Sequence, residues 1–223
     1  MVEGARRLTA GLALAFAAAF ANAAPAPANV PERLIASGHC RDGLPHGAYQ
    51  LRGPDGTLRV AGAFNRGKRT SSFIFWTSRG VRIAHLPYDE GVLSGTVSLW
   101  YADAARGREP QQKLEAGYAA GQLDGESRSW HAGGKPRAVL VYARGTLVAA
   151  KAWTAAGAAL PADAARALAA RDAEADERYY RSLEAIVDAH PPRCDEDAAT
   201  PSPPRPVPGG TADTRRDFRR RSA

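Results

Sequence analysis

The sequence predicts a mainly β protein: one elongated antiparallel meander sheet, followed by a single C-terminal helix and a disordered tail. Three observations support this fold class. Glycines recur with a 24-residue period, short runs of alternating residues separate the glycine-containing turns, and one long amphipathic stretch follows the last turn. Self-similarity at a fixed period of this length is typical of stacked repeat arrays.

The glycine ladder has five members, and the same residue types return around each of them. An aromatic residue stands three positions before each of the last four ladder glycines, and a tryptophan follows eight or nine positions after each of four of them. Glycine adopts the positive φ of tight hairpin turns without steric cost, so each ladder position predicts a turn. The repeat-defining residues are Gly43, Gly67, Gly91, Gly121 and Gly145, with Phe64, Tyr88, Tyr118 and Tyr142.

The segments between these turns are predicted to be strands. In the second copy, residues 72–76 form a strand, residues 77–80 a turn and residues 81–84 the returning strand. Consecutive hairpins of this kind make an antiparallel meander. We expect a lead-in and first strand at residues 24–39 and about five hairpin copies of 24 residues over residues 40–160.

An amphipathic helix is predicted at residues 161–190. Proline stands at its first turn, and Pro191 and Pro192 follow its end, which are typical start and stop signals. Its expected apolar stripe consists of Leu168, Ala175, Tyr179, Leu183, Ile186 and Val187. Such a helix measures roughly 43 Å, and about ten strands span roughly 45 Å of sheet. A helix that runs back along the sheet would therefore end at the first strand.

The two cysteines bear on this arrangement. A helix that runs back would bring Cys194 to the strand that holds Cys40. An even number of cysteines in an exported protein favours a disulfide, so we expect the Cys40–Cys194 bond, with two free thiols as the alternative.

The repeated segments resemble a known family. The pattern Gly-x-aromatic-x-x-Gly-x-x-x-Gly, followed by tryptophan and glycine, is similar to the bacterial variant of the MORN repeat. Residues 62–67 and 117–130 match it best, and the resemblance covers roughly residues 40–160. The first copy departs from it with Arg52 in the tryptophan position, and the second with Ser71 in place of a glycine. Repeat arrays mostly bind other molecules, so we expect a non-enzymatic scaffold that binds a protein partner through its sheet face or insertion loop. The resemblance implies two kinds of partner: similar bacterial proteins are often labelled antitoxins, which would make the partner a toxin, and MORN repeats have been linked to phospholipid surfaces.

The N-terminus predicts export. Arg6 and Arg7 precede an apolar stretch at residues 8–20, and residues 21–23 form an A-x-A cleavage site. We therefore expect a signal peptide at residues 1–23, cleavage after Ala23 and a periplasmic or secreted protein. A buried N-terminal helix is the alternative.

The C-terminus changes character after the predicted helix. Residues 191–223 are rich in proline and arginine, which predicts a disordered basic tail. Such a tail could contact anionic phospholipid or an acidic protein, or it could be a solubilising terminus without a further role. No nucleic acid partner is expected for an exported protein. The clustered arginines are Arg215, Arg216, Arg219, Arg220 and Arg221.

Catalytic motifs, metal-ligand spacings and cofactor-binding glycine patterns are not evident in the sequence, so we expect no enzyme, no metal and no cofactor. Both faces of the predicted strands carry large apolar residues, and one face should take the helix. The other would then be an aromatic binding face, unless the aromatic side chains pack on one another as core. The insertion at residues 102–112 is a second candidate binding element, or neutral decoration. The candidate binding residues are Trp76, Trp100, Trp130, Arg106 and Arg108.

Overall fold

The computed structural model describes residues 33–103 and 108–194. The predicted signal peptide, the lead-in up to residue 32, Arg106 and the arginine-rich tail from residue 195 onward lie outside these ranges.

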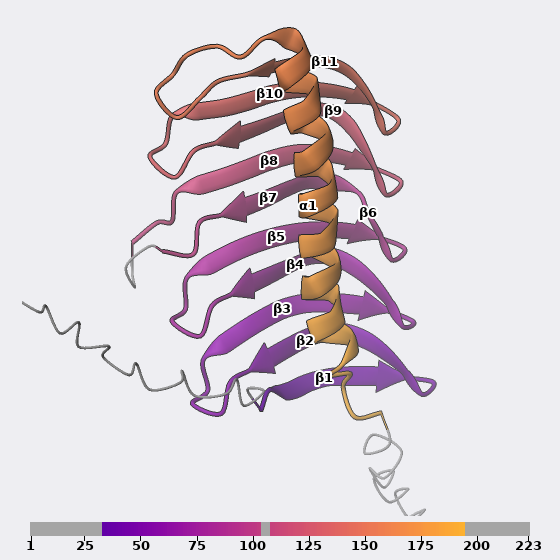
Figure 1. Cartoon of the computed structure of the whole chain (residues 1–223). Helices are drawn as coiled ribbons and strands as arrows, with labels where there is room; N and C mark the ends of the chain where they lie inside the picture. Colours follow the sequence, from indigo (N-terminus) through magenta and orange to yellow (C-terminus); the bar gives the residue numbers. More distant parts are fainter. Residues whose placement is uncertain (1–32, 104–107, 195–223) are drawn as a thin grey trace, which may run out of the picture. The chain divides into compact units, whose positions relative to one another are not determined.

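The described chain folds into one antiparallel meander sheet of eleven strands with one helix, which confirms the predicted fold class (Figure 1). The sheet order follows the chain, β1-β2-β3-β4-β5-β7-β8-β9-β10-β11, while the short β6 pairs with β5, and the sheet does not close on itself. The elements are β1 (Ile35–Arg41), β2 (Leu44–Arg52), β3 (Leu58–Asn65), β4 (Lys68–Trp76), β5 (Arg82–Asp89), β6 (Val92–Leu93), β7 (Gly95–Trp100), β8 (Gln112–Ala119), β9 (Gln122–Trp130), β10 (Pro136–Ala143), β11 (Thr146–Ala152) and α1 (Ala162–Asp188).

The ladder glycines are the second residues of two-residue hairpin turns. Between β5 and β6, Glu90 and Gly91 have φ angles of 48° and 91°. Two consecutive positive φ angles define the type I′ turn, whose twist matches that of the strands it joins. The other four ladder turns share this geometry and lie at residues 42–43, 66–67, 120–121 and 144–145.

Each ladder turn after the first is also bonded to the start of the strand that follows the preceding ladder turn. The backbone N–H of Gly91 donates to the carbonyl oxygen of Arg69, two residues beyond the preceding ladder glycine, at 2.9 Å. The same bond joins Gly67 to Pro45, Gly121 to Leu93 and Gly145 to Leu123, each at 2.8 Å. The turns therefore form a continuous hydrogen-bonded column along one edge of the hairpins, which fixes their stacking.

Helix α1 crosses one face of the sheet from the last strand back to the first (Figure 1). At its start, the N–H of Leu160 donates to the carbonyl of Ala152 on β11 at 2.8 Å. Beyond its end, Cys194 forms a disulfide with Cys40 on β1, with the two Cα atoms 5.3 Å apart. The predicted disulfide and the predicted direction of the helix are both confirmed.

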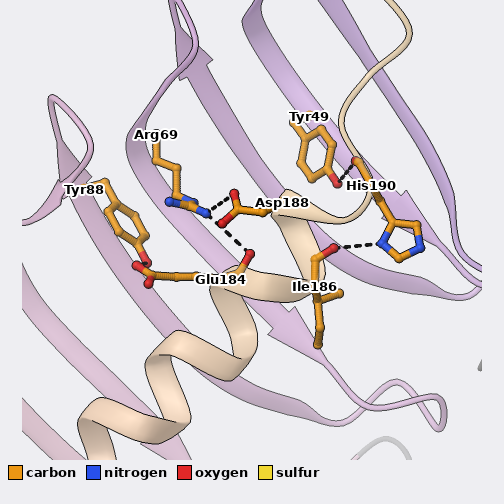
Figure 2. Close-up of polar contacts among 7 residues, drawn as sticks. All are labelled: Tyr49, Arg69, Tyr88, Glu184, Ile186, Asp188 and His190. Carbon is orange, nitrogen blue, oxygen red and sulfur yellow. Dashed lines mark hydrogen bonds and ion pairs between the residues drawn. The ribbon is translucent and has the colours of Figure 1, made fainter.

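Three hydrogen-bonded contacts tie the C-terminal part of the helix to successive hairpins (Figure 2). The Tyr88 hydroxyl donates to the carboxylate of Glu184 at 2.8 Å. Arg69 forms an ion pair with Asp188. The Tyr49 hydroxyl donates to the carbonyl of His190 at 2.7 Å, and burial, with a smaller contribution from Asp188, raises the pKa of this phenol to about 12.

The hydrophobic core lies between the sheet and the helix in two separate clusters. The larger one extends over β2 to β8 and includes Phe73, Phe75 and Leu99 beneath the helix residues Leu183 and Val187. Its aromatic rings meet edge to face: Phe64 lies 5.4 Å from Tyr49 and from Phe73, and Phe73 lies 5.5 Å from Tyr88. The smaller cluster joins the start of the helix to the last two strands through Ala138, Leu140, Tyr142, Ala152, Ala165 and Ala169.

The buried stripe of the helix differs from the predicted one. Leu183 and Val187 are buried as expected, but Leu168, Tyr179 and Ile186 are half-buried and Ala175 is exposed. The most buried helix residues are Ala165, Ala169, Tyr180, Leu183 and Val187. The helix face that contacts the sheet is therefore rotated relative to the predicted stripe. It includes Asp172 and Asp176, which a search for apolar residues alone does not select.

Candidate functional site

The face of the sheet opposite the helix carries two of the predicted tryptophans. Side chains alternate between the faces of a strand. Because Phe73 and Phe75 of β4 are buried under the helix, Ile74 and Trp76 lie on the other face, and Trp100 alternates with the buried Leu99 in the same way. We call this surface the open face.

Arg82 of β5 lies between these two tryptophans. It pairs in register with Trp76, and its guanidinium lies over the indole ring of Trp100, 4.1 Å from the ring centroid. A cation over an indole face is attracted by the ring quadrupole. The Nε atom of Arg82 is buried and has no hydrogen-bond partner among the described residues.

The insertion after β7 reaches the same place. Its ends are joined by a hydrogen bond from the N–H of Tyr101 to the carbonyl of Gln111, at 2.9 Å. Glu109 forms an ion pair with Arg82 at 3.3 Å, and Arg79 donates to the carbonyl of Ala102 at 2.9 Å.

Together these residues surround a hollow of about 310 Å³, which is lined by Ile74, Trp76, Gly80, Val81, Arg82, Arg108, Glu109 and Pro110. Two of the predicted binding residues, Trp76 and Arg108, therefore meet here. Trp100 adjoins the hollow, because Arg82 of its lining lies over the Trp100 ring. We call the hollow together with Trp100 the tryptophan–arginine hollow. Sequence reasoning missed Arg82, although its place in the returning strand opposite Trp76 could have indicated it.

Trp130 is not part of this group. Its carbonyl accepts a hydrogen bond from the Tyr101 hydroxyl at 2.9 Å. It lines a different cavity, on the helix-covered side, together with Tyr118 and Tyr142 of the repeat-defining set.

That second cavity measures about 300 Å³ and lies between α1 and strands β8 to β10, where the two core clusters separate. We call it the helix–sheet cavity. Two aspartates of the helix, Asp172 and Asp176, line it opposite Lys113 and Arg137 of the sheet. Sequence reasoning singled out none of these four residues.

Bulges bring the two basic side chains to the helix side. Lys113 is the extra residue of a bulge in β8, because its neighbours Gln112 and Leu114 pair with the consecutive residues Trp100 and Leu99 of β7. Arg137 is the extra residue of a bulge in β10 in the same way, opposite β9. The extra residue of a bulge breaks the regular alternation of side chains. Arg137 consequently reaches Asp172 of the helix, with Nη2 donating to Oδ1 at 2.9 Å and Nη1 bonding the other carboxylate oxygen.

Asp176 is the unusual charge of this cavity. It forms no hydrogen bond or ion pair that the described part of the chain shows, and burial raises its pKa to about 6, an effect that Lys113 partly opposes. By contrast, Asp172 raises the pKa of Arg137 through their hydrogen bonds. Both aspartates could have been recognised from the sequence by helical spacing. They continue the steps of three and four residues along the inner helix face, which includes positions 165, 169, 172, 176, 180, 183 and 187.

Within the described ranges, no group of three or more histidine, cysteine, aspartate or glutamate side chains could hold a metal ion, and no helix is long and apolar enough to cross a membrane. No protein-family model matches the chain, and no curated protein matches it in sequence.

Proposed function

We propose that this protein is a non-enzymatic, exported repeat scaffold that binds a protein partner at the tryptophan–arginine hollow of its open face. One observation carries the proposal. Trp76, Trp100, Arg82 and Arg108, from two hairpins and the longest loop, converge on a face that no other described element covers. Tryptophan and arginine are the residue types most enriched at the centres of protein interfaces.

The charges favour an acidic partner. This region has three positive charges, from Arg79, Arg82 and Arg108. Its one negative charge among the described residues is that of Glu109, which Arg82 already neutralises in part. The whole chain has a formal net charge of +7. Carboxylates of a partner would complement the exposed guanidinium of Arg108 and could compete with Glu109 for Arg82.

The Cys40–Cys194 disulfide is compatible with the oxidising compartment that export implies. The resemblance to bacterial MORN variants extends the proposal to the kind of partner: a toxin that this scaffold neutralises.

The test is a crosslinked pull-down from the native cell envelope, read by mass spectrometry, with the mature, oxidised protein as bait. Arg108→Glu reverses an exposed charge of the hollow. Arg128→Glu is the matched control, because Arg128 lies on the open face of β9, is exposed and forms its ion pair with Glu126, away from the hollow. We expect the wild type and Arg128→Glu to capture the same stoichiometric protein and Arg108→Glu to lose it.

Equal capture by Arg108→Glu and by Trp76→Ala would refute this site. Recovery of anionic phospholipid instead of protein, abolished by deletion of residues 195–223, would favour a membrane-associated structural role over the scaffold.

A further inference from the structure

The inner face of α1 carries an acidic interruption at its centre. Ala165 and Ala169 pack on one core cluster, and Tyr180, Leu183 and Val187 pack on the other. The two positions between them are Asp172 and Asp176, which line the helix–sheet cavity. Apolar side chains at these positions would join the clusters into one core, so the sequence maintains a cavity where packing alone would close it.

Only one of the two aspartates is neutralised by a neighbour. Asp172 is bonded twice by Arg137. Asp176 has no such partner within the described chain, and the cation that acts on it most strongly is Lys113, whose ammonium lies over the ring of Tyr179 at 5.8 Å from the centroid. A carboxylate that is largely removed from water and left unpaired carries a free-energy cost, which a bound cation would relieve.

The walls of the cavity offer further polar groups. Tyr180 is 3% exposed, and its buried hydroxyl has the Tyr118 hydroxyl as its hydrogen-bonding neighbour. The Oγ atom of Ser129 is buried and has no hydrogen-bond partner among the described residues. Buried polar atoms normally have partners, so the Ser129 hydroxyl on the wall of this cavity indicates a polar guest.

The surroundings have an acidic balance. A second hollow of about 450 Å³ shares Tyr118, Leu123, Ala173 and Tyr180 with the helix–sheet cavity. Its charged lining residues are three glutamates, Glu174, Glu177 and Glu184, against Arg181. Glu177 is paired with Arg181 and Glu174 with Arg178, so Glu184 leaves this lining acidic by one charge, which favours cations over anions.

From this arrangement we propose that the helix–sheet cavity binds a small organic cation, with an alkylammonium group at the carboxylate of Asp176 and its hydrocarbon part against the rings of Tyr118, Tyr142 and Tyr180. An ammonium satisfies the carboxylate by charge-assisted hydrogen bonds, and the tyrosine faces attract the same cation. A pocket of mainly apolar walls with a few convergent polar groups is the usual form of a small-molecule site.

The pKa of Asp176 supports this assignment. Burial raises it to about 6, so the carboxylate is ionised at neutral pH but at the expense of folding stability. Residues that lower stability and remain unpaired are concentrated at binding sites.

The experiment is isothermal titration of the oxidised protein at neutral pH with n-butylammonium and with 1,5-diaminopentane, and with n-butanol as the uncharged probe. We expect both amines to bind and butanol not to bind. Asp176→Asn should weaken amine binding by about tenfold or more. Glu174→Gln is the matched control, because Glu174 is an exposed acid on the same helix that lines only the second hollow. It should change the affinity by less than about twofold.

Three results would overturn the proposal: no heat with either amine, equal binding of butanol, or equal weakening by Glu174→Gln. The last would show general attraction to an acidic helix instead of a site at Asp176. Thermal unfolding of each variant, measured alongside, shows that it is folded.

Discussion

Arg137 of β10 and Asp172 of α1 are joined by two parallel hydrogen bonds, one of them 2.9 Å long, at the boundary between the two core clusters. Both side chains are largely shielded from solvent, with 29% and 23% of their surfaces exposed. A bidentate arginine–carboxylate pair fixes orientation as well as charge. It therefore sets the distance between helix and sheet at the place where apolar packing is interrupted.

Removal of one partner should cost more than removal of both. Arg137→Met leaves Asp172 unpaired, and we expect the free energy of unfolding to fall by about 2 kcal/mol, less than for a fully buried pair. The double variant Arg137→Met/Asp172→Leu should recover at least half of this loss. Urea unfolding of the four proteins of the cycle measures the coupling, and strict additivity would contradict the interpretation.

Loss of the Cys40–Cys194 disulfide should destabilise the fold by about 2–4 kcal/mol, because the bond closes a very long loop in the unfolded chain. The measurement is the urea midpoint with and without reductant. The double variant Cys40→Ser/Cys194→Ser should match the reduced wild type and show no response to reductant. A wild-type midpoint that does not change on reduction would mean that the bond contributes nothing.

Gly62 of β3 should not tolerate a side chain. A Cβ atom there would lie 2.6 Å from the ring of Phe73, which is fully buried and has no room to move. We expect Gly62→Ala to cost about 1–3 kcal/mol. Gly133→Ala is the control, because a Cβ at Gly133 meets nothing within 4 Å and its φ angle is not in the left-handed region. Equal thermal stability of the two variants would argue against this packing.

Asp176→Asn should stabilise the protein at neutral pH but not in acid. The folded-state pKa is about 6, above the ordinary value of 3.8, so between these values the folded protein binds more protons than the unfolded chain. Stability contributed by this group is present below about pH 4 and is lost as the pH rises through about 6.

The asparagine variant avoids this loss, so we expect a gain of about 1–2 kcal/mol above pH 6.5 and almost none at pH 4, after allowance for partial exposure. Thermal unfolding of both proteins from pH 4 to pH 8 gives the curve. Asp172→Asn should do the opposite at neutral pH, because it breaks the ion pair with Arg137. A destabilised Asp176→Asn at pH 7 would mean that the carboxylate has a favourable partner after all.

The turns, the meander, the helix and its disulfide were predictable because their signals are local or follow from length. A glycine at a two-residue turn and a proline at a helix start act on their own neighbours, and the match between helix length and sheet width is simple geometry. The choice of face was not predictable in this way. Ile74 and Trp76 are as apolar as Phe73 and Phe75, so the side that takes the helix depends on packing along the whole sheet.

The helix–sheet cavity was missed for two physical reasons. A search for an apolar stripe passes over Asp172 and Asp176, although both face the sheet. Strict alternation from Leu114 and Ala138 assigns Lys113 and Arg137 to the open face, but bulges turn both toward the helix. Register shifts of a single residue depend on the pairing of neighbouring strands, which the sequence of one strand does not reveal.

The helix that runs from β11 back to Cys40 also constrains how this protein can evolve. Repeat arrays commonly gain or lose copies, because each copy contacts only its neighbours. Here one 24-residue copy adds two strands and widens the sheet by about 10 Å, which corresponds to roughly six or seven helical residues. A duplicated copy would carry the first strand out of reach of Cys194 unless the helix grew by nearly two turns in the same event. The number of hairpins is therefore inherited together with the length of the helix, and homologues should differ in both or in neither.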